Sequence, residues 1–209
     1  MLLHKNMQLL ICLGNVGQQY IHTRHNAGWI VADALFPNVA WKFDKYAQSE
    51  TAQIMIGECV VLLAKPHTFM NNSGETALYL CKQFNIATNQ VIVLYDDIDV
   101  PVGSIKLSTT GNSNHNGIRS IIAHLKTQDF VRLRIGVGSS ERNSALHDYV
   151  LGGFSMGESE ILHATMPRLK TVLENIVTLG IVYAQNNLKP KVTKKIENID
   201  TEVDKLSIE

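Results

Sequence analysis

The sequence predicts a single α/β domain of three layers, in which helices cover both faces of a mixed, twisted sheet. Segments with the apolar pattern of strands alternate with segments at helical spacing, which is the arrangement of α/β folds. Residues 91–95 are continuously apolar, as in strands that are covered on both faces. The 209 residues are 45% hydrophobic and 18% charged, which suits one globular core.

The chain is predicted to begin with a strand, a turn and a helix. The strand is residues 8–13, and it ends at a turn over residues 14–17. The helix is residues 26–36. Pro37 stops this helix, because proline has no amide hydrogen with which to continue the hydrogen-bond ladder.

A hairpin and a second helix are predicted next. Residues 51–56 and 59–64 are β-rich runs separated by a Gly-Glu pair, which indicates a hairpin. Asn72, followed three residues later by Glu75, indicates the capped start of a helix over residues 72–84.

The second half of the chain continues the alternation of strands and helices. A long helix is predicted at residues 160–184, and Pro167 is expected to bend or restart it. The other elements expected in this half are strands at residues 91–95, 105–107 and 131–137 and a helix at 118–125.

Several features indicate the domain boundary and the compartment. Residues 1–187 are expected to form the domain, and residues 188–209, lysine-rich and then acidic, a flexible or loosely docked tail. We expect a cytoplasmic protein, because no apolar run has the length of a signal peptide core or a membrane span. Three scattered cysteines lack the spacing of a disulfide frame or a zinc site: Cys12, Cys59 and Cys81.

Charge is balanced overall and uneven locally. The chain has 19 basic and 19 acidic side chains, which argues mildly against a nucleic-acid partner. Residues 103–135, however, hold five basic residues and one acidic residue. This segment suits a localised phosphate-binding face, although a solvated helix surface would give the same count.

Polar side chains gather in four predicted loops. Because ligands of open α/β sheets bind beyond the carboxyl ends of the strands, these loops are expected to share one rim. They present one or more histidines, several carboxamides and carboxylates, at residues 14–28, 67–72, 96–99 and 111–117.

The side chains of these loops exclude several kinds of chemistry. The sequence has no G-x-S-x-G elbow, no H-E-x-x-H metal spacing and no glycine-rich nucleotide motif. What remains is a histidine with a potential carboxylate partner, which can act as a general base for water. Asparagines can donate to a developing oxyanion. The set therefore suits hydrolysis of an activated acyl group such as an ester.

Six blocks of sequence are more specific than any single residue. They are Leu13-Gly14-Asn15-Val16-Gly17 with Tyr20 and Thr23-Arg24-His25-Asn26-Ala27-Gly28; Thr68-Phe69-Met70-Asn71-Asn72-Ser73-Gly74; Asp96-Asp97-Ile98-Asp99-Val100-Pro101-Val102-Gly103; His115-Asn116-Gly117; Arg132-Leu133-Arg134-Ile135-Gly136; and Val150-Leu151-Gly152. In this order they resemble the bacterial peptidyl-tRNA hydrolase family, from residue 7 to about residue 186. The resemblance implies the peptidyl-tRNA hydrolase/phosphorylase-like fold.

The resemblance also implies a reaction and its residues. His25 would be the general base that activates water against the ester joining a peptide to the 3′ end of tRNA, and Asp96 would hydrogen-bond it. The implied partner is peptidyl-tRNA, bound through its acceptor stem and 3′ CCA end, with no metal or cofactor and a monomeric enzyme. The implied substrate contacts are Asn15, Asn71 and Asn116, with Asn15 or Asn71 near the oxyanion. Tyr20 and Met70 would line the site. Arg134, with Lys106 or Arg142, would meet tRNA phosphates.

The chain departs from the family pattern at three places. Val16 stands where the family usually has proline, which predicts a less rigid first turn. Residues 112–114 replace a run of mostly glycines, which predicts a stiffer loop before His115. Ser108 stands where a basic residue is usual.

Ordinary structural interpretations remain open beside the functional ones. A lone loop histidine is usually only hydrogen-bonded, and His115 is expected to be structural or rim-lining. Asp97 and Asp99 are typical turn formers, as Asp96 could also be. Arg134 alternates with Arg132 on one strand and could form an exposed salt-bridged face.

Two other functions compete with hydrolysis of peptidyl-tRNA. One is a non-catalytic RNA-binding protein on the same scaffold, like the chloroplast splicing-factor relatives of the family. Retention of a histidine base with a carboxylate and three asparagines argues against it. The other is an esterase for a small acyl substrate, which the local basic segment disfavours. A nucleotide-dependent dehydrogenase is remote, because its glycine turn is missing.

Overall fold

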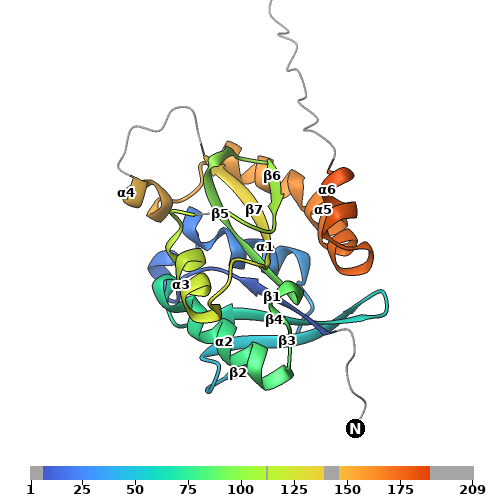
Figure 1. Ribbon diagram of the computed structural model, residues 1–209. Coiled ribbons are helices and arrows are strands. Elements are labelled where there is room, and N and C mark those ends of the chain that lie inside the picture. Colours follow the sequence, from blue (N-terminus) through green and yellow to red (C-terminus); the bar gives the residue numbers. More distant parts are fainter. Residues whose placement is uncertain (1–6, 112, 139–145, 189–209) are drawn as a thin grey trace, which may run out of the picture.

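The computed structural model describes residues 7–111, 113–138 and 146–188. These residues form one sheet of seven strands in the order β2-β3-β4-β1-β5-β7-β6 (Figure 1). The strands are β1 (Met7–Cys12), β2 (Lys42–Asp44), β3 (Ser49–Ile56), β4 (Cys59–Pro66), β5 (Val91–Pro101), β6 (Ile105–Ser108) and β7 (Val131–Gly138).

The centre of the sheet is parallel and its margins are antiparallel. β1 pairs in parallel with both β4 and β5, so that Leu10 lies opposite Leu63 on one side and Ile92 on the other. β5 pairs in parallel with β7, whereas β2, β3 and β6 run antiparallel to their neighbours. The carboxyl ends of four parallel strands therefore meet at one edge, which is where the chain can gather side chains for a site.

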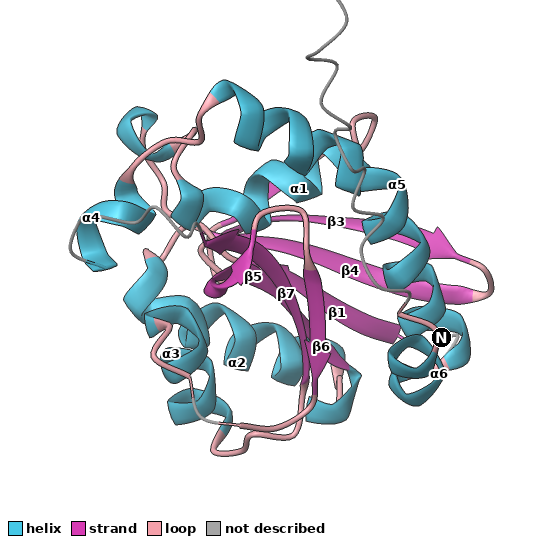
Figure 2. Cartoon of the chain, turned by 90° about the horizontal axis from the view of Figure 1, so that it is seen from above, coloured by secondary structure: helices cyan, strands magenta, loops and turns pink. Residues whose placement is uncertain are grey.

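Helices cover both faces of the sheet, as predicted (Figure 2). One face carries α1 (Ala27–Leu35), α5 (Met156–Leu179) and α6 (Ile181–Asn186), and the other carries α2 (Ser73–Phe84) and α3 (Asn116–Leu125). A short helix, α4 (Leu146–Leu151), lies near the start of α3 in Figure 1. The three-layer α/β prediction is confirmed.

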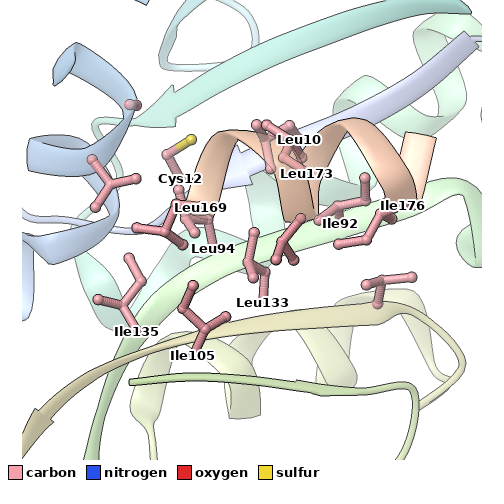
Figure 3. Close-up of a cluster of buried hydrophobic side chains, with 14 of the residues drawn as sticks. Leu10, Cys12, Ile92, Leu94, Ile105, Leu133, Ile135, Leu169, Leu173 and Ile176 are labelled. Atoms are coloured by element: carbon pink, nitrogen blue, oxygen red, sulfur yellow. The ribbon is translucent and has the colours of Figure 1, made fainter. Parts of the chain in front are cut away.

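The two faces have separate apolar cores because successive side chains of a strand point to opposite sides. Leu10, Ile92 and Leu133 meet α5 on the first face through Leu169 and Leu173 (Figure 3). Leu9, Val93 and Ile118 belong to the core on the second face. The continuous apolar run of β5 is thus explained by burial on both sides.

Gly28 lets α1 pack directly on the sheet. A Cβ atom at this position would lie 2.4 Å from the carbonyl oxygen of Leu13 and 2.7 Å from that of Leu94. Both neighbours are backbone atoms of the central strands or their ends, so they cannot move aside easily. The glycine therefore fixes the distance between the sheet and the turn that precedes α1.

Two expectations about element ends were wrong. β5 extends to Pro101, so Asp96 and Asp97 lie in the strand, paired with Ile135 and Gly136 of β7, and not in a loop. Pairing with β7 supplies the hydrogen bonds that make these polar residues part of a strand. Asn72 makes no side-chain capping bond, because a 3₁₀ turn, Met70–Asn72, leads directly into α2.

The last helical region also differs from the prediction. α5 begins at Met156, capped by Ser155, and continues through Pro167 without ending. Buried side chains on both sides of the proline, including Leu162 and Leu169, hold the helix against the sheet. The interruption falls at Gly180, whose φ of 87° is readily adopted only by glycine, and α6 follows it.

Short elements escaped the sequence analysis. They are β2, α4 and 3₁₀ turns at Gln18–Tyr20, Arg24–Asn26, Met70–Asn72 and Thr88–Gln90. The expected tail lies outside the described residues, apart from Leu188, which packs against the core. Among the described helices, none has the length and apolarity needed to cross a membrane.

Candidate active site

A cavity of about 920 Å³ opens at the carboxyl edge of the parallel strands. All four polar loops of the sequence analysis contribute to its lining, together with Val150 and Leu151 of α4. The eight predicted site residues all line it: Asn15, Tyr20, His25, Met70, Asn71, Asp96, Asn116 and Arg134. The fold thus brings together side chains that are up to 119 positions apart, between Asn15 and Arg134.

His25 is oriented by Asp96. Its Nδ1 lies 2.9 Å from Oδ2 and 3.1 Å from Oδ1 of the carboxylate. An ionised carboxylate only accepts hydrogen bonds, so Nδ1 carries the proton and donates it, and the lone pair is on Nε2. The histidine is presented by the 3₁₀ turn Arg24–Asn26, which we call the His25 turn, and its side chain is 13% exposed.

A second histidine, His115, shares the same carboxylate. Its Nε2 lies 2.9 Å from Asp96 Oδ1, and its Nδ1 accepts a hydrogen bond from the backbone N–H of Ile118 at the start of α3. Both ring nitrogens of His115 are therefore engaged, and the ring packs 4.9 Å from that of His25. This arrangement suits a supporting group, and of the two histidines His25 is the one with a ring nitrogen left for a ligand.

The two histidines stabilise a carboxylate that is only 2% exposed. Burial by itself would raise the pKa of Asp96, but electrostatic attraction and hydrogen bonds from the N–H groups of His115 and then His25 outweigh it. The net pKa of Asp96 lies well below its ordinary value. Asp96 therefore stays ionised and remains a hydrogen-bond acceptor throughout the neutral range.

Asn15 is held so that its amide hydrogens are available to a ligand. Its Oδ1 accepts a hydrogen bond of 2.8 Å from the backbone N–H of Met70. Its backbone N–H and C=O are both bound by the side chain of Asn26, at 2.8 and 2.9 Å. Because the oxygen is occupied, Nδ2 is the part of the side chain that can donate to a substrate oxygen.

The other predicted contacts surround this centre. Met70 is 3% exposed and forms part of the cavity floor, whereas Asn71 and Asn116 are exposed and Tyr20 is half-buried. Asn71 lies beside Met70 in the 3₁₀ turn, and Asn116 is the first residue of α3. These positions allow contact with a ligand in the cavity.

The basic side of the cavity lies along β6 and β7. Arg134 donates to Asp97 through Nε and forms an ion pair with it, and Lys106 lies opposite Arg134 in the sheet register. Arg132 is 2% exposed and donates to the carbonyl oxygens of Gln128 and Phe130. Arg134, with a side chain 30% exposed, is the better placed of the two arginines to meet a phosphate. Arg142 lies outside the described residues.

Several contacts of the site were missed from sequence. The bond of His115 to Asp96, the ion pair of Asp97 and Arg134, and the brace of Asn26 all join residues distant in the chain. His115 lies three residues before the predicted helix of residues 118–125 and is the N-cap of the observed α3, a position where a polar side chain often caps.

The geometry of the site also bears on whether a metal ion or a cysteine thiol could take part in the chemistry. The ligand atoms of His25, Asp96 and His115 lie within 4.8 Å of one another and could hold a metal ion. The hydrogen bonds already account for both histidine nitrogens that face the carboxylate. Burial raises the pKa of Cys12 to about 12 and that of Cys81 to about 11, so neither thiol supplies a nucleophile near neutrality.

An α/β fold with an oriented histidine, a buried carboxylate and carboxamides in one cavity is typical of a hydrolytic enzyme. The peptidyl-tRNA hydrolase family model matches residues 9–198, and the chain belongs to that family.

Similar proteins cover most of the chain. A peptidyl-tRNA hydrolase of Listeria monocytogenes serotype 4b (strain CLIP80459) is 38% identical over 188 residues, which are 88% of this chain and all of that protein. One of Dichelobacter nodosus is 38% identical over 83% of this chain and 94% of its own. The crystal structure of the Acinetobacter baumannii peptidyl-tRNA hydrolase superposes with a TM-score of 0.80 at 30% identity, covering 87% of this chain and 93% of that one.

Proposed function

We propose that the protein hydrolyses the ester bond between a peptide, or an N-acylated amino acid, and the 3′ end of tRNA, using water activated by His25. The observation that carries this proposal is the hydrogen bond from His25 Nδ1 to Asp96 inside the cavity. It leaves Nε2 as a base within reach of a water molecule and a substrate in the same space.

The proposed reaction has two proton transfers. His25 Nε2 takes a proton from water as the water oxygen attacks the ester carbonyl, and Asp96 stabilises the imidazolium that forms. Nδ2 of Asn15, or the amide of Asn71, donates to the oxyanion of the tetrahedral intermediate. The imidazolium then protonates the departing 3′ oxygen of the tRNA, which releases a free 3′ hydroxyl and the carboxylic acid of the peptide, and this acid loses its proton to solvent.

The remaining residues would bind the substrate. Tyr20 and Met70 line the cavity, and Asn116 and Asn71 supply hydrogen bonds to the peptide and the 3′-terminal nucleotide of the CCA end. Arg134, with Lys106 nearby, would meet phosphates of the acceptor stem, which adds affinity without reading sequence. We further propose a monomeric, cytoplasmic enzyme that needs neither a metal nor an organic cofactor.

The non-catalytic RNA-binding alternative is disfavoured by the site. A binding module needs no oriented histidine, and the carboxylate that orients His25 is buried at a cost that binding alone would not justify. An esterase for small acyl substrates is distinguished by salt, because phosphate contacts weaken as salt rises.

The first test is hydrolysis of N-acetyl-aminoacyl-tRNA by the wild type and by His25→Ala, with EDTA present and salt varied. We expect cleavage by the wild type alone, no effect of EDTA, and a rise in KM with salt, since phosphate contacts release counterions. His25→Ala should still fold and bind tRNA.

Three results would contradict the proposal. Normal turnover by folded His25→Ala would remove His25 as the base. Loss of activity with EDTA would indicate a metal in the reaction. A folded wild type that binds tRNA without cleaving the ester would favour the RNA-binding alternative.

A further inference from the structure

We infer that Arg24 is a positioning residue, which fastens the His25 turn to the segment joining α4 and α5 and thereby keeps His25 against Asp96. This inference rests on the proposed role of His25 as the base. It concerns a side chain that points away from the cavity and would not touch the substrate.

The backbone of the His25 turn is bound to a distant part of the chain. The N–H of Arg24 donates to the carbonyl oxygen of Gly152 at 2.9 Å, and Thr23 forms a β-bridge with Gly153. The absence of a side chain at Gly152 also leaves room for the Arg24 guanidinium, since a Cβ there would lie 3.2 Å from Nη1. The contact joins two of the sequence blocks, residues 23–28 and 150–152. The proposed chemistry gives no role to the second block.

The guanidinium of Arg24 adds a polar anchor. One nitrogen donates to the carbonyl oxygen of Gly153 at 2.6 Å, and the other pairs with Glu158 at 2.7 Å. The Arg24 and Glu158 side chains are only 11% and 18% exposed, so solvent screens the pair less than at an open surface. The same Glu158 oxygen accepts the N–H of Ser155 in the cap of α5, which ties the arginine to the helix start.

Aromatic side chains enclose the guanidinium. Its central carbon lies 4.3 Å from the ring centre of Tyr149 in α4 and 5.5 Å from that of Phe154. Tyr149 is itself fixed, because its hydroxyl donates to the carbonyl oxygen of Val137 at the end of β7. Cation–π contacts of this kind favour one placement of the arginine.

His25 therefore lies between two anchored neighbours. Asn26 binds the loop after β1 through Asn15, and Arg24 binds the α4–α5 segment. The neighbouring Val150 and Leu151 of α4 line the cavity, so Arg24 also fixes the base relative to that wall. Without the Arg24 guanidinium, the turn would keep its bond to Asn15 and its backbone contacts with Gly152 and Gly153 but would lose its link to Glu158 and α5. A displacement of about 1 Å at a catalytic group can cost 10²-fold in rate.

The test is a double-mutant cycle of Arg24→Met and Asp96→Ala, measured as kcat and KM for N-acetyl-aminoacyl-tRNA. Arg24→Met should lower kcat by at least about tenfold, with KM changed by less than about twofold. In the Asp96→Ala background, where the orienting carboxylate is gone, Arg24→Met should cost less than about twofold more. Glu158→Gln, which retains an oxygen for the Ser155 cap, should lower kcat less than Arg24→Met does.

Asp33→Asn is the matched control for loss of an ion pair. It breaks the pair of Lys65 and Asp33 in α1, and neither residue lines the cavity. It should leave kcat within about twofold of the wild type even if the melting temperature falls. A kcat loss in Arg24→Met that persists undiminished in the Asp96→Ala background, or no loss in a folded variant, would overturn the inference.

A second readout does not depend on activity. Nitrogen NMR of the histidine rings, with His25 assigned by comparison with His25→Ala, should show the Nδ1–H tautomer in the wild type and a mixture of tautomers in Arg24→Met. An unchanged tautomer would overturn the positioning role even if the wild type failed to cleave the ester. A wild type that cleaves while Arg24→Met is indistinguishable from it would refute Arg24 alone and leave the proposed function intact.

Discussion

At the scale of single residues, Asp96 divides its two oxygens between two histidines. His25 donates to one oxygen and His115 to the other, and His115 is fixed in turn by the N–H of Ile118. Two donors offset the cost of burying the charge. The orientation of His25, the proposed base, thus depends on a chain of contacts that ends in the first turn of α3.

Asp96→Ala should reduce kcat by roughly 10²-fold or more, because His25 loses the acceptor that fixes its tautomer. The tRNA affinity should change little, since Asp96 is buried. Steady-state kinetics and a tRNA binding assay on the same preparation would measure both. Retention of the wild-type kcat by a folded Asp96→Ala variant would contradict the orienting role.

The pH dependence of stability should also report Asp96. Its pKa is lower in the folded protein than in the unfolded chain, so the unfolded chain binds the proton first as pH falls. The stabilisation is complete above the ordinary carboxyl pKa of about 4 and is lost below it. Urea unfolding from about pH 6 to about pH 3 should show that the free energy of unfolding falls more steeply with acid in the wild type than in Asp96→Ala. Equal slopes would contradict the lowered pKa.

The sequence predicted the eight cavity residues but few of the contacts among them. The family resemblance paired His25 with Asp96, whereas the loop residues by themselves indicated only a histidine with some carboxylate partner. The partners of Arg24, His115 and Asp97 were not predicted, because they lie 19 to 134 positions away in the chain. Contacts between residues so far apart in the chain leave no periodic pattern in the sequence.

At the scale of elements, buried strands and amphipathic helices were predicted well, and short or paired elements were not. The length of β5 was underestimated because Asp96 and Asp97 are typical of turns, yet pairing with β7 keeps them in the strand. β2 has three residues, two of them exposed, and so lacks an apolar pattern. The break at Gly180 was missed because Pro167 is the stronger local signal.

Gly28→Ala should destabilise the protein by about 3 kcal/mol, because its Cβ would overlap backbone atoms of Leu13. This corresponds to a fall in melting temperature of roughly 6 to 12 °C for a chain of this size. Gly157→Ala in α5 is the matched control, since a Cβ there meets nothing within 4 Å. It should be neutral or stabilise by up to about 1 kcal/mol. Equal melting temperatures for the two variants would contradict the packing of α1 on the sheet.

At the scale of the whole molecule, the parallel centre of the sheet explains why one cavity collects residues from most of the chain. β1, β4, β5 and β7 all deliver loops or strand ends to the same edge. The alternation of strands and helices was sufficient to predict this edge. It could not predict the pocket wall from α4, which is only six residues long.

A chain ending at Leu188 should remain folded and active, because Leu188 is the last described residue that packs against the core. Its melting temperature should lie within about 2 °C of the full chain. A chain ending at Gly180 should lose stability, since it lacks α6 and the buried Ala184. Thermal unfolding and hydrolysis assays would compare them. Inactivity of the longer truncation would assign a role to residues 189–209.

The bond between Arg24 and Glu158 spans 134 positions, which has a consequence during synthesis. A growing chain cannot form this contact until Glu158 has been added to it, by which time about three quarters of the polypeptide exists. Until then the turn that carries His25 lacks one of its two anchors. The nascent protein is itself a peptide esterified to tRNA, and the turn that carries its proposed base is completed only late in its own synthesis.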